Sequence, residues 1–113
     1  MSFQLHHVGD ILVAQVEPNR MHGDMVEDFR RALMGVADLQ PRLILLDLSA
    51  VEYVDSTALS ALVAFQSAFG DGVHLCGIHT TVQEVMRLTR LDDLFPIHST
   101  REAALKAMQA PEH

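Results

Sequence analysis

Two aspartates, Asp47 and Asp55, lie at the two ends of a short connection between a hydrophobic run and the next predicted helix. Asp47 lies in the run "LILLDL", and Asp55 is followed directly by Ser56 and Thr57. Paired carboxylates of this kind suggest an acid–base pair or a magnesium site. An aspartate followed by serine is also an ordinary helix start, where the side chain accepts a hydrogen bond from a free backbone N–H. For Asp55 we favour the helix start.

Other signatures of catalytic and metal sites do not occur in the sequence. It contains no GxxxxGK[ST] phosphate loop, no GxGxxG turn and no GxSxG elbow. The histidines have neither an i,i+4 pair nor a short zinc-type spacing with cysteine, so we expect surface or packed side chains rather than metal ligands. They are His6, His7, His22, His74, His79, His98 and His113. An enzyme using Asp47, Asp55 and a histidine is the least favoured hypothesis, and we predict no catalysis, cofactor or metal.

Composition narrows the class of protein further. The 113 residues are 49% hydrophobic and 20% charged, which is typical of one globular domain, here 1–113 with a frayed tail at 110–113. The net charge of -7 disfavours nucleic acid and anionic lipid as partners. No apolar run is long enough to cross a bilayer, and "MSFQLHHVGD" lacks the layout of a signal peptide, so we expect a cytoplasmic protein. The lone Cys76 sits in "VHLCGI" and is expected to be a buried core residue.

Hydrophobic periodicity predicts alternating strands and helices. Gly9-Asp10 separates two β-branched segments within 3–16 and predicts an antiparallel hairpin. Asp24 is placed to cap the first helix, and Ser99 or Thr100 the last. The further elements that we predict are a helix over 24–36, a strand over 42–48, a helix over 56–69, a strand over 73–78, a helix over 81–91, a short edge strand within 94–99 and a helix from 100. This order indicates an α/β fold with a mixed, mostly parallel sheet.

The predicted helix over 56–69 has no charged residue. At 3.6 residues per turn, one stripe carries the small side chains of Ser56, Ser60, Val63 and Ser67, while the large apolar side chains face elsewhere. A merely solvated face would normally carry lysine, glutamate or arginine. Two interpretations remain: the helix is buried almost all round, or the stripe receives another protein, because small uncharged side chains allow close approach.

Ser56 would stand in the first turn of this helix, at the surface. A phosphate there would meet free backbone N–H groups and the positive end of the helix dipole, so the fold would tolerate it. It would also add a charge of about -1.5 to -2 to the edge of a neutral face, which would repel a partner docked there. From the residues alone, a helix cap at Asp55 or Ser56 is the commoner explanation.

The run "LILLDLSAVEYVDSTALSALV" resembles the signature of the STAS domain family, the bacterial anti-sigma factor antagonists. The shared features are an apolar strand ending in Asp-Leu-Ser, a spacer with an aromatic residue, and Asp-Ser-Ser/Thr opening a helix. The segment "VHLCGIHTTVQEVMRLTRLDDLFPIHSTREAALKAM" is similar to the second half of that family. The resemblance implies a STAS-like sheet of about four to five strands, with about four helices packed mainly on one side.

The resemblance also implies a function. A STAS antagonist is a binding module without catalytic activity, which binds an anti-sigma factor and so frees the sigma factor. Ser56 is then the residue phosphorylated by that anti-sigma factor, a serine kinase of the histidine-kinase-like ATPase type. Phosphorylation releases the partner, and a metal-dependent serine phosphatase resets the switch. The implied partner-binding residues are Asp55, Ser56, Thr57, Ser60, Val63 and Ser67, with His22 or Asp24 from the loop "EPNRMHGD".

Ala58 and Ser60 depart from the family pattern, because each stands where glycine is common. We expect the added methyl and hydroxyl to narrow the approach of a kinase to Ser56. A permanent interface needs no such access, so the departures favour an alternative: a constitutive STAS subunit of a lipid-transport ABC complex or of a stress-sensing scaffold.

Overall fold

The two amino-terminal strands form the predicted hairpin. The structure is a computed structural model that describes residues 3–17, 20–21 and 23–109. β1 (Phe3–Val8) and β2 (Ile11–Val16) pair antiparallel across the Gly9-Asp10 turn. Gly9 has a φ of 59°, a left-handed conformation that glycine adopts without steric cost. His22 and the predicted frayed tail at 110–113 lie outside the described residues.

The remaining strands of the main sheet are parallel, as predicted. The sheet order is β1-β2-β4-β6-β7, in which β4 (Leu43–Asp47) is central and β6 (Val73–Cys76) and β7 (Ile97–His98) follow. Every pair except β1–β2 is parallel. The four apolar residues that begin β4 reflect burial on both faces of the sheet. β7 is the predicted edge strand, and its position at the edge is compatible with Pro96 next to it.

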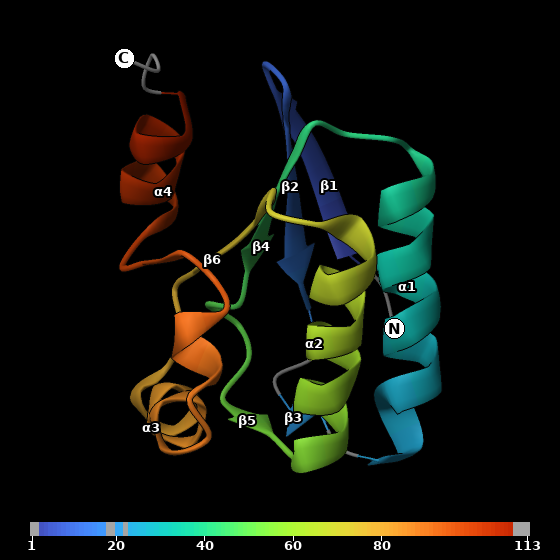
Figure 1. Ribbon diagram of the computed structural model, residues 1–113, viewed down its shortest axis with the longest axis vertical. Coiled ribbons are helices and arrows are strands. Elements are labelled where there is room, and N and C mark those ends of the chain that lie inside the picture. The colour runs from blue at the N-terminus through green and yellow to red at the C-terminus, as the bar shows by residue number, and fades with distance from the viewer. Residues whose placement is uncertain (1–2, 18–19, 22, 110–113) are drawn as a thin grey trace.

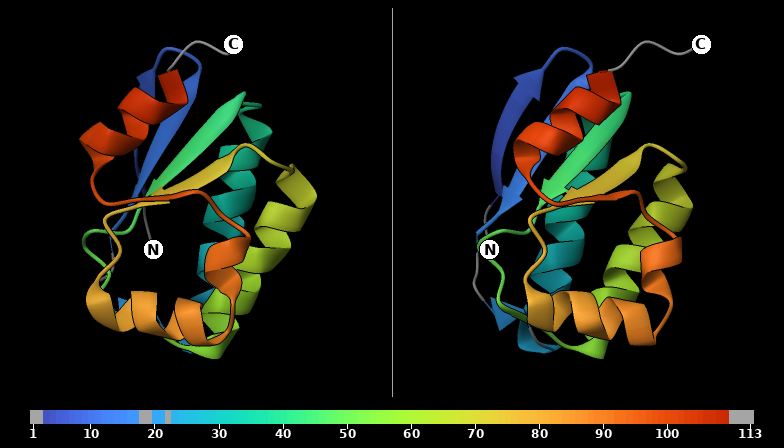
Figure 2. Two further views of the ribbon diagram at one scale, coloured as in Figure 1. Left: turned by 60° about the vertical axis from the view of Figure 1, so that its left-hand side comes forward. Right: turned by 90° about the vertical axis from the view of Figure 1, so that its left-hand side faces the viewer.

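The helices cover the sheet unequally. α1 (Val26–Asp38), α2 (Ser56–Phe69) and α3 (Thr80–Leu88) contribute to the larger core. α4 (Arg101–Gln109) lies on the opposite face, over a smaller cluster that includes Cys76 (Figures 1 and 2). The expected arrangement, with helices mainly on one side of a mostly parallel sheet, is confirmed.

Helix ends differ from prediction where a local turn intervenes. Asp24 does not cap α1: it lies in a short 3-10 helix, η1 (Gly23–Met25), and Met25 occupies the cap position without a side-chain hydrogen bond. Thr100 caps α4, because its Oγ1 accepts a hydrogen bond from the Ala103 N–H at 3.0 Å. α3 ends three residues early, and a second 3-10 helix, η2 (Leu91–Asp93), begins after Arg90, whose φ is 62°.

A second, two-stranded sheet was not predicted. β3 (Arg20–Met21) and β5 (Tyr53–Val54) pair in parallel, with Met21 beside Val54. Two-residue strands are too short to show any hydrophobic period, so sequence reasoning could not find them. The pair ties the segment before α1 to the residues directly before α2. β3, β5 and the start of α2 consequently gather at one end of the molecule (Figure 1).

Candidate functional site

Asp55 is the N-cap of α2, as the sequence indicates. Its backbone is extended, with φ -99° and ψ 177°, and its Oδ1 accepts a hydrogen bond from the Ala58 N–H at 3.0 Å. The Thr57 hydroxyl donates a second hydrogen bond to the same oxygen at 2.6 Å. One carboxylate oxygen therefore accepts a hydrogen bond from a backbone N–H that has no partner within the helix, and a second from the Thr57 side chain.

Ser56 is the first residue of α2 and is exposed. Among the hydrogen bonds of the described residues, none involves its hydroxyl; those of Thr57 and Ser60 are engaged, the latter donating to the Ser56 carbonyl at 2.9 Å. Because Asp55 provides the cap, the Ser56 hydroxyl has no part in starting the helix. It is an exposed hydroxyl at the positive end of a helix dipole. The interpretation of Ser56 itself as the cap is wrong.

The two faces of α2 are sharply different. The face toward the sheet is buried and consists of Ala58, Leu59, Ala61, Leu62 and Phe65. On the outer face Ser56, Ser60 and Ser67 are exposed and Val63 is half-buried. The interpretation of a helix buried almost all round is therefore wrong. The predicted stripe of Ser56, Ser60, Val63 and Ser67, which we call the serine stripe, is a real and uncharged surface.

The two departures from the family's glycines do not obstruct this surface. Ala58 is 2% exposed, so its methyl group lies in the core and not at the approach to Ser56. The Ser60 hydroxyl turns back to the backbone of its own helix. The expectation that the methyl of Ala58 narrows access to Ser56 is wrong, because the helix places residue 58 on the opposite side from residues 56 and 60.

Asp24 lies near this site. It is exposed and belongs to η1, which packs against α2. The pairing of Met21 with Val54 brings the segment before η1 alongside the residues that lead into Asp55. The structure thus assembles Asp24 and the start of α2 at one end of the molecule, while His22 is not among the described residues.

Asp47 serves a different purpose from Asp55. It is 5% exposed, and its Oδ2 accepts a hydrogen bond from Arg101 Nε of α4 at 2.8 Å. Its Oδ1 accepts one from the Ser49 N–H at 2.9 Å. Burial alone would raise the pKa of Asp47, but the hydrogen bonds from Ser49 and the charge of Arg101 hold it below its usual value. The carboxylate is thus an ion-pair partner, and its link to Arg101 carried no sequence signal because 54 residues separate the two.

No metal centre is formed within the described parts of the chain. In residues 3–17, 20–21 and 23–109, no three His, Cys, Asp or Glu side chains come together as ligands. His74 and His98 do meet on neighbouring strands, where Nδ1 of His74 lies 3.0 Å from Nε2 of His98 and the rings stack. Cys76 is buried as predicted, and burial raises its pKa to about 12, so its thiol is unreactive at neutral pH.

Among the described helices, none combines the length and the apolar character needed to span a bilayer.

Comparisons with known proteins identify the family. The STAS domain model matches residues 4–104, and the chain therefore belongs to the STAS domain family. A comparison with curated protein sequences found no match. An anti-sigma factor antagonist from Mycobacterium paratuberculosis is similar in structure with a TM-score of 0.87 and 24% identity, over 96% of this chain and 94% of that chain.

Two further solved structures show the range of proteins with this fold. The murine anion transporter Slc26a9 matches with a TM-score of 0.80 and 16% identity, over 94% of this chain and 19% of that chain. The anti-sigma factor antagonist SpoIIAA in its unphosphorylated form matches with a TM-score of 0.69 and 19% identity, over 98% of this chain and all, 100%, of that chain. The fold thus occurs both in anti-sigma factor antagonists and within a much longer transporter chain.

Proposed function

We propose that this protein is a non-enzymatic protein–protein switch of the anti-sigma factor antagonist kind, controlled by phosphorylation of Ser56. The observation that carries the proposal is the start of α2: an exposed serine hydroxyl without a structural role heads an exposed face that has no charge. The STAS family and the antagonists among its structural neighbours support the same conclusion.

In the unphosphorylated state, the serine stripe receives the partner. Its side chains are short, so a partner helix or loop can approach α2 closely, and no charged group loses its hydration on docking. Asp55, Thr57 and Asp24 border the stripe at its amino-terminal end, and His22 belongs to the same loop in the sequence. The partner that we propose is an anti-sigma factor that is also a serine kinase of the histidine-kinase-like ATPase type. Binding it releases the sigma factor and so regulates transcription.

Phosphorylation reverses this interaction. The kinase transfers the γ-phosphoryl group of ATP to the Ser56 oxygen, which loses its proton, and ADP leaves. The product carries about -1.5 to -2 charges where the stripe was neutral. The free N–H groups of the first turn of α2 stabilise the phosphate within this protein, while Asp55 next to it adds further negative charge. The partner dissociates through like-charge repulsion, and a metal-dependent serine phosphatase restores the free hydroxyl. We place this cycle in the bacterial cytoplasm.

Two measurements test the proposal. Mass spectrometry of the protein from its native host should find partial phosphorylation at Ser56. Calorimetry against each purified histidine-kinase-like anti-sigma factor of that host should give binding to the wild type and at least about tenfold weaker binding to Ser56→Asp, since like charges at an interface cost several kcal/mol.

The matched control is Ser99→Asp, the same substitution at an exposed serine between β7 and α4, outside the serine stripe. It should bind as the wild type does. Equal affinity of the wild type and Ser56→Asp, with both folded by circular dichroism, contradicts the switch.

A second candidate is the constitutive subunit, and the fold of this chain within the transporter Slc26a9 favours it. In this alternative the serine stripe is a permanent interface of a lipid-transport ABC complex or a stress-sensing scaffold. Affinity purification from the native host distinguishes the two: a copurifying transporter ATPase and no phosphate at Ser56 support the subunit, and partial phosphate supports the switch.

A further inference from the structure

Hydrogen bonds through Asp47 join α4 to the segment that leads into Ser56. Arg101 of α4 is the first link: its Nε donates to Asp47 Oδ2 at 2.8 Å, and its Nη2 donates to Gln15 Oε1 at 3.0 Å. The Asp47 side chain is 6% exposed and that of Arg101 29%. This ion pair is largely screened from water and lies across the sheet from α2.

The other oxygen of Asp47 holds the residues that follow β4. We call residues 48–55 the β4–α2 connection. Its Ser49 N–H donates to Asp47 Oδ1 at 2.9 Å. A Cβ added at Gly77, whose φ is 69°, would lie 2.9 Å from the Ser49 Cβ, so the connection rests directly on the backbone after β6. One carboxylate therefore fixes both α4 and the start of the connection.

The start of α3 holds the same connection from its other side. Nε2 of His79 lies 2.9 Å from the Ser49 carbonyl oxygen and donates its hydrogen to it. The Thr81 hydroxyl donates to the Glu52 carbonyl oxygen at 2.8 Å. Glu52 directly precedes β5, which leads into Asp55. Side chains from the start of α3 thus contact the backbone that leads to the cap of α2, and one from α4 contacts it through Asp47; none of them belongs to the serine stripe.

We infer that Arg101 and Thr81 are positioning residues for the Ser56 site, an inference that rests on the function proposed above. Without Arg101, Asp47 would be a buried anion without its counter-charge, and it would turn toward water or take up a proton. Either change weakens its hydrogen bond to Ser49, which is strongest when the acceptor is ionised. Without the Thr81 hydroxyl, the Glu52 carbonyl loses its partner. In both cases the backbone between Ser49 and Asp55 gains freedom.

Amide hydrogen exchange by NMR tests the inference without any partner. The variants are Arg101→Met and Thr81→Val, which keep much of the side-chain volume. The Ala58 amide, bonded to Asp55 at the Ser56 site, should exchange about tenfold faster in Arg101→Met, near the lower limit for loss of a hydrogen bond to a charged group. In Thr81→Val it should exchange about twofold faster, because the lost hydrogen bond joins neutral groups and is exposed. The Ile44 amide of the central strand, bonded to the Gly72 carbonyl, reports overall stability. The exchange rate of Ala58 is therefore divided by that of Ile44 in each variant.

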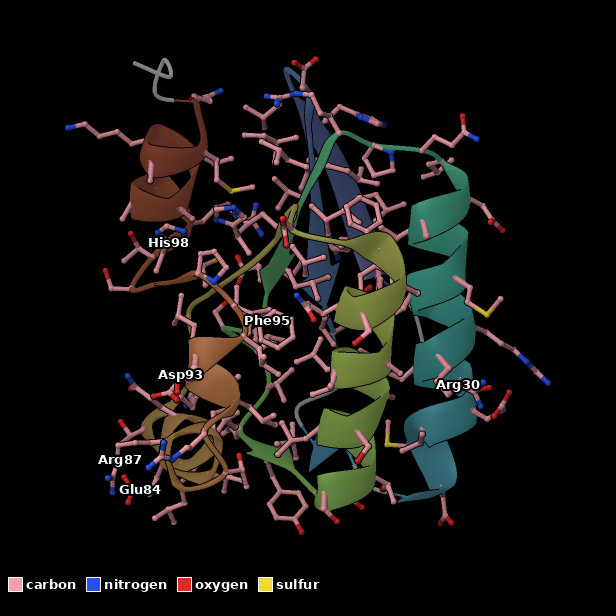
Figure 3. The ribbon with its side chains drawn as sticks, in the orientation of Figure 1. Arg30, Glu84, Arg87, Asp93, Phe95 and His98 are labelled. Carbon is pink, nitrogen blue, oxygen red and sulfur yellow. The ribbon has the colours of Figure 1, made fainter. Side chains whose placement is uncertain are left out.

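Two further variants separate positioning from general destabilisation. Arg87→Met removes an exposed arginine that pairs with Glu84 on the outer end of α3 (Figure 3), and it should leave the Ala58 amide unchanged. Arg101→Lys keeps a positive charge beside Asp47 and should restore a large part of the protection. An unchanged Ala58 amide in Arg101→Met, relative to Ile44, overturns the inference, and so does equal loss in Arg87→Met.

Binding provides the functional readout. At a temperature where all variants are folded, Arg101→Met should bind the kinase-type anti-sigma factor about tenfold more weakly than the wild type, and Thr81→Val about twofold more weakly. The affinity of Arg101→Lys should lie between those of the wild type and Arg101→Met. Wild-type affinity in both variants, despite a faster Ala58 amide, also overturns the inference. If the wild type itself binds no such factor and carries no phosphate, the proposed function fails, and the exchange rates alone then decide whether the two side chains position the site.

Discussion

Asp55 should contribute measurably to stability because two hydrogen bonds meet at one oxygen of its side chain. That oxygen accepts from the Ala58 N–H and from the Thr57 hydroxyl. Asp55→Ala removes the acceptor and the negative charge at the amino-terminal end of α2 together. The Ala58 amide, which is part-buried, would then have no partner in the first turn.

The expected loss follows from the two terms that the substitution removes. Replacing an N-cap aspartate by alanine costs about 1 kcal/mol. The interaction of an exposed charge with the helix dipole adds about 0.3–1 kcal/mol. The Thr57 hydroxyl is exposed and can bond to water instead, so its loss adds little. The sum is about 1–2 kcal/mol, which for a chain of this length lowers the melting temperature by about 4–8 °C.

Urea unfolding followed by circular dichroism measures this loss, with the dependence on urea unchanged because the fold is the same. Asp55→Asn is the informative control: it keeps an acceptor oxygen and removes only the charge, so it should cost less than about 1 kcal/mol. Asp71→Ala, at an exposed position after α2, should cost almost nothing. A wild-type midpoint for Asp55→Ala, or an Asn variant as unstable as the Ala variant, refutes this account of the helix start.

Two further predictions concern stability. Gly77→Ala should cost more than about 1 kcal/mol in the same urea assay, because residue 77 has a left-handed φ of 69° and the new methyl would lie 2.9 Å from the Ser49 Cβ; a neutral effect contradicts the contact. Burial, and then the neighbouring His98, lower the pKa of His74. The unfolded chain therefore binds a proton at His74 more readily than the folded chain does. The contribution of neutral His74 to the free energy of unfolding is complete above its ordinary pKa of 6.5 and is lost as pH falls below that value. The contribution of ionised Asp47 is lost only below about pH 3.8. Urea midpoints at about pH 7.5 and about pH 5 should therefore differ less in His74→Gln than in the wild type, and an identical difference contradicts the assignment.

The regular elements could be predicted from the sequence because local patterns encode them. Gly9 specifies the hairpin turn, the apolar run at 43–48 specifies a strand covered on both faces, and Gly70 ends α2 with a φ of 106°. The bounds of α2 were predicted to the residue because a cap and a glycine mark its two ends. The Asp24 cap failed because a 3-10 turn competed with the helix start, and a short turn has no distinct sequence signal.

For the candidate site, too, part could be predicted from the sequence and part depended on the folded structure. The sequence alone placed Ser56 at a helix start and aligned the serine stripe on one face, since helical spacing depends on nothing beyond the chain itself. It could not decide whether that face was covered, which residue supplied the cap, or where the Ala58 methyl pointed. Packing against the sheet buried Ala58 and left Ser56 exposed, and the extended backbone at Asp55 let that side chain take the cap.

Apart from the local bond between Asp47 and Ser49, the side-chain hydrogen bonds described for the β4–α2 connection and for Asp47 join residues far apart in the sequence. Arg101 is 54 residues from Asp47 and 86 from Gln15, and Thr81 is 29 from Glu52. Such partners meet because parallel strands bring distant segments of the chain to the same end of the sheet. This protein's sequence determined its regular elements and placed Ser56 at a helix start. Its tertiary structure decided which faces are buried and which distant side chains hydrogen-bond to one another, because burial and long-range hydrogen bonds exist only once the chain has folded.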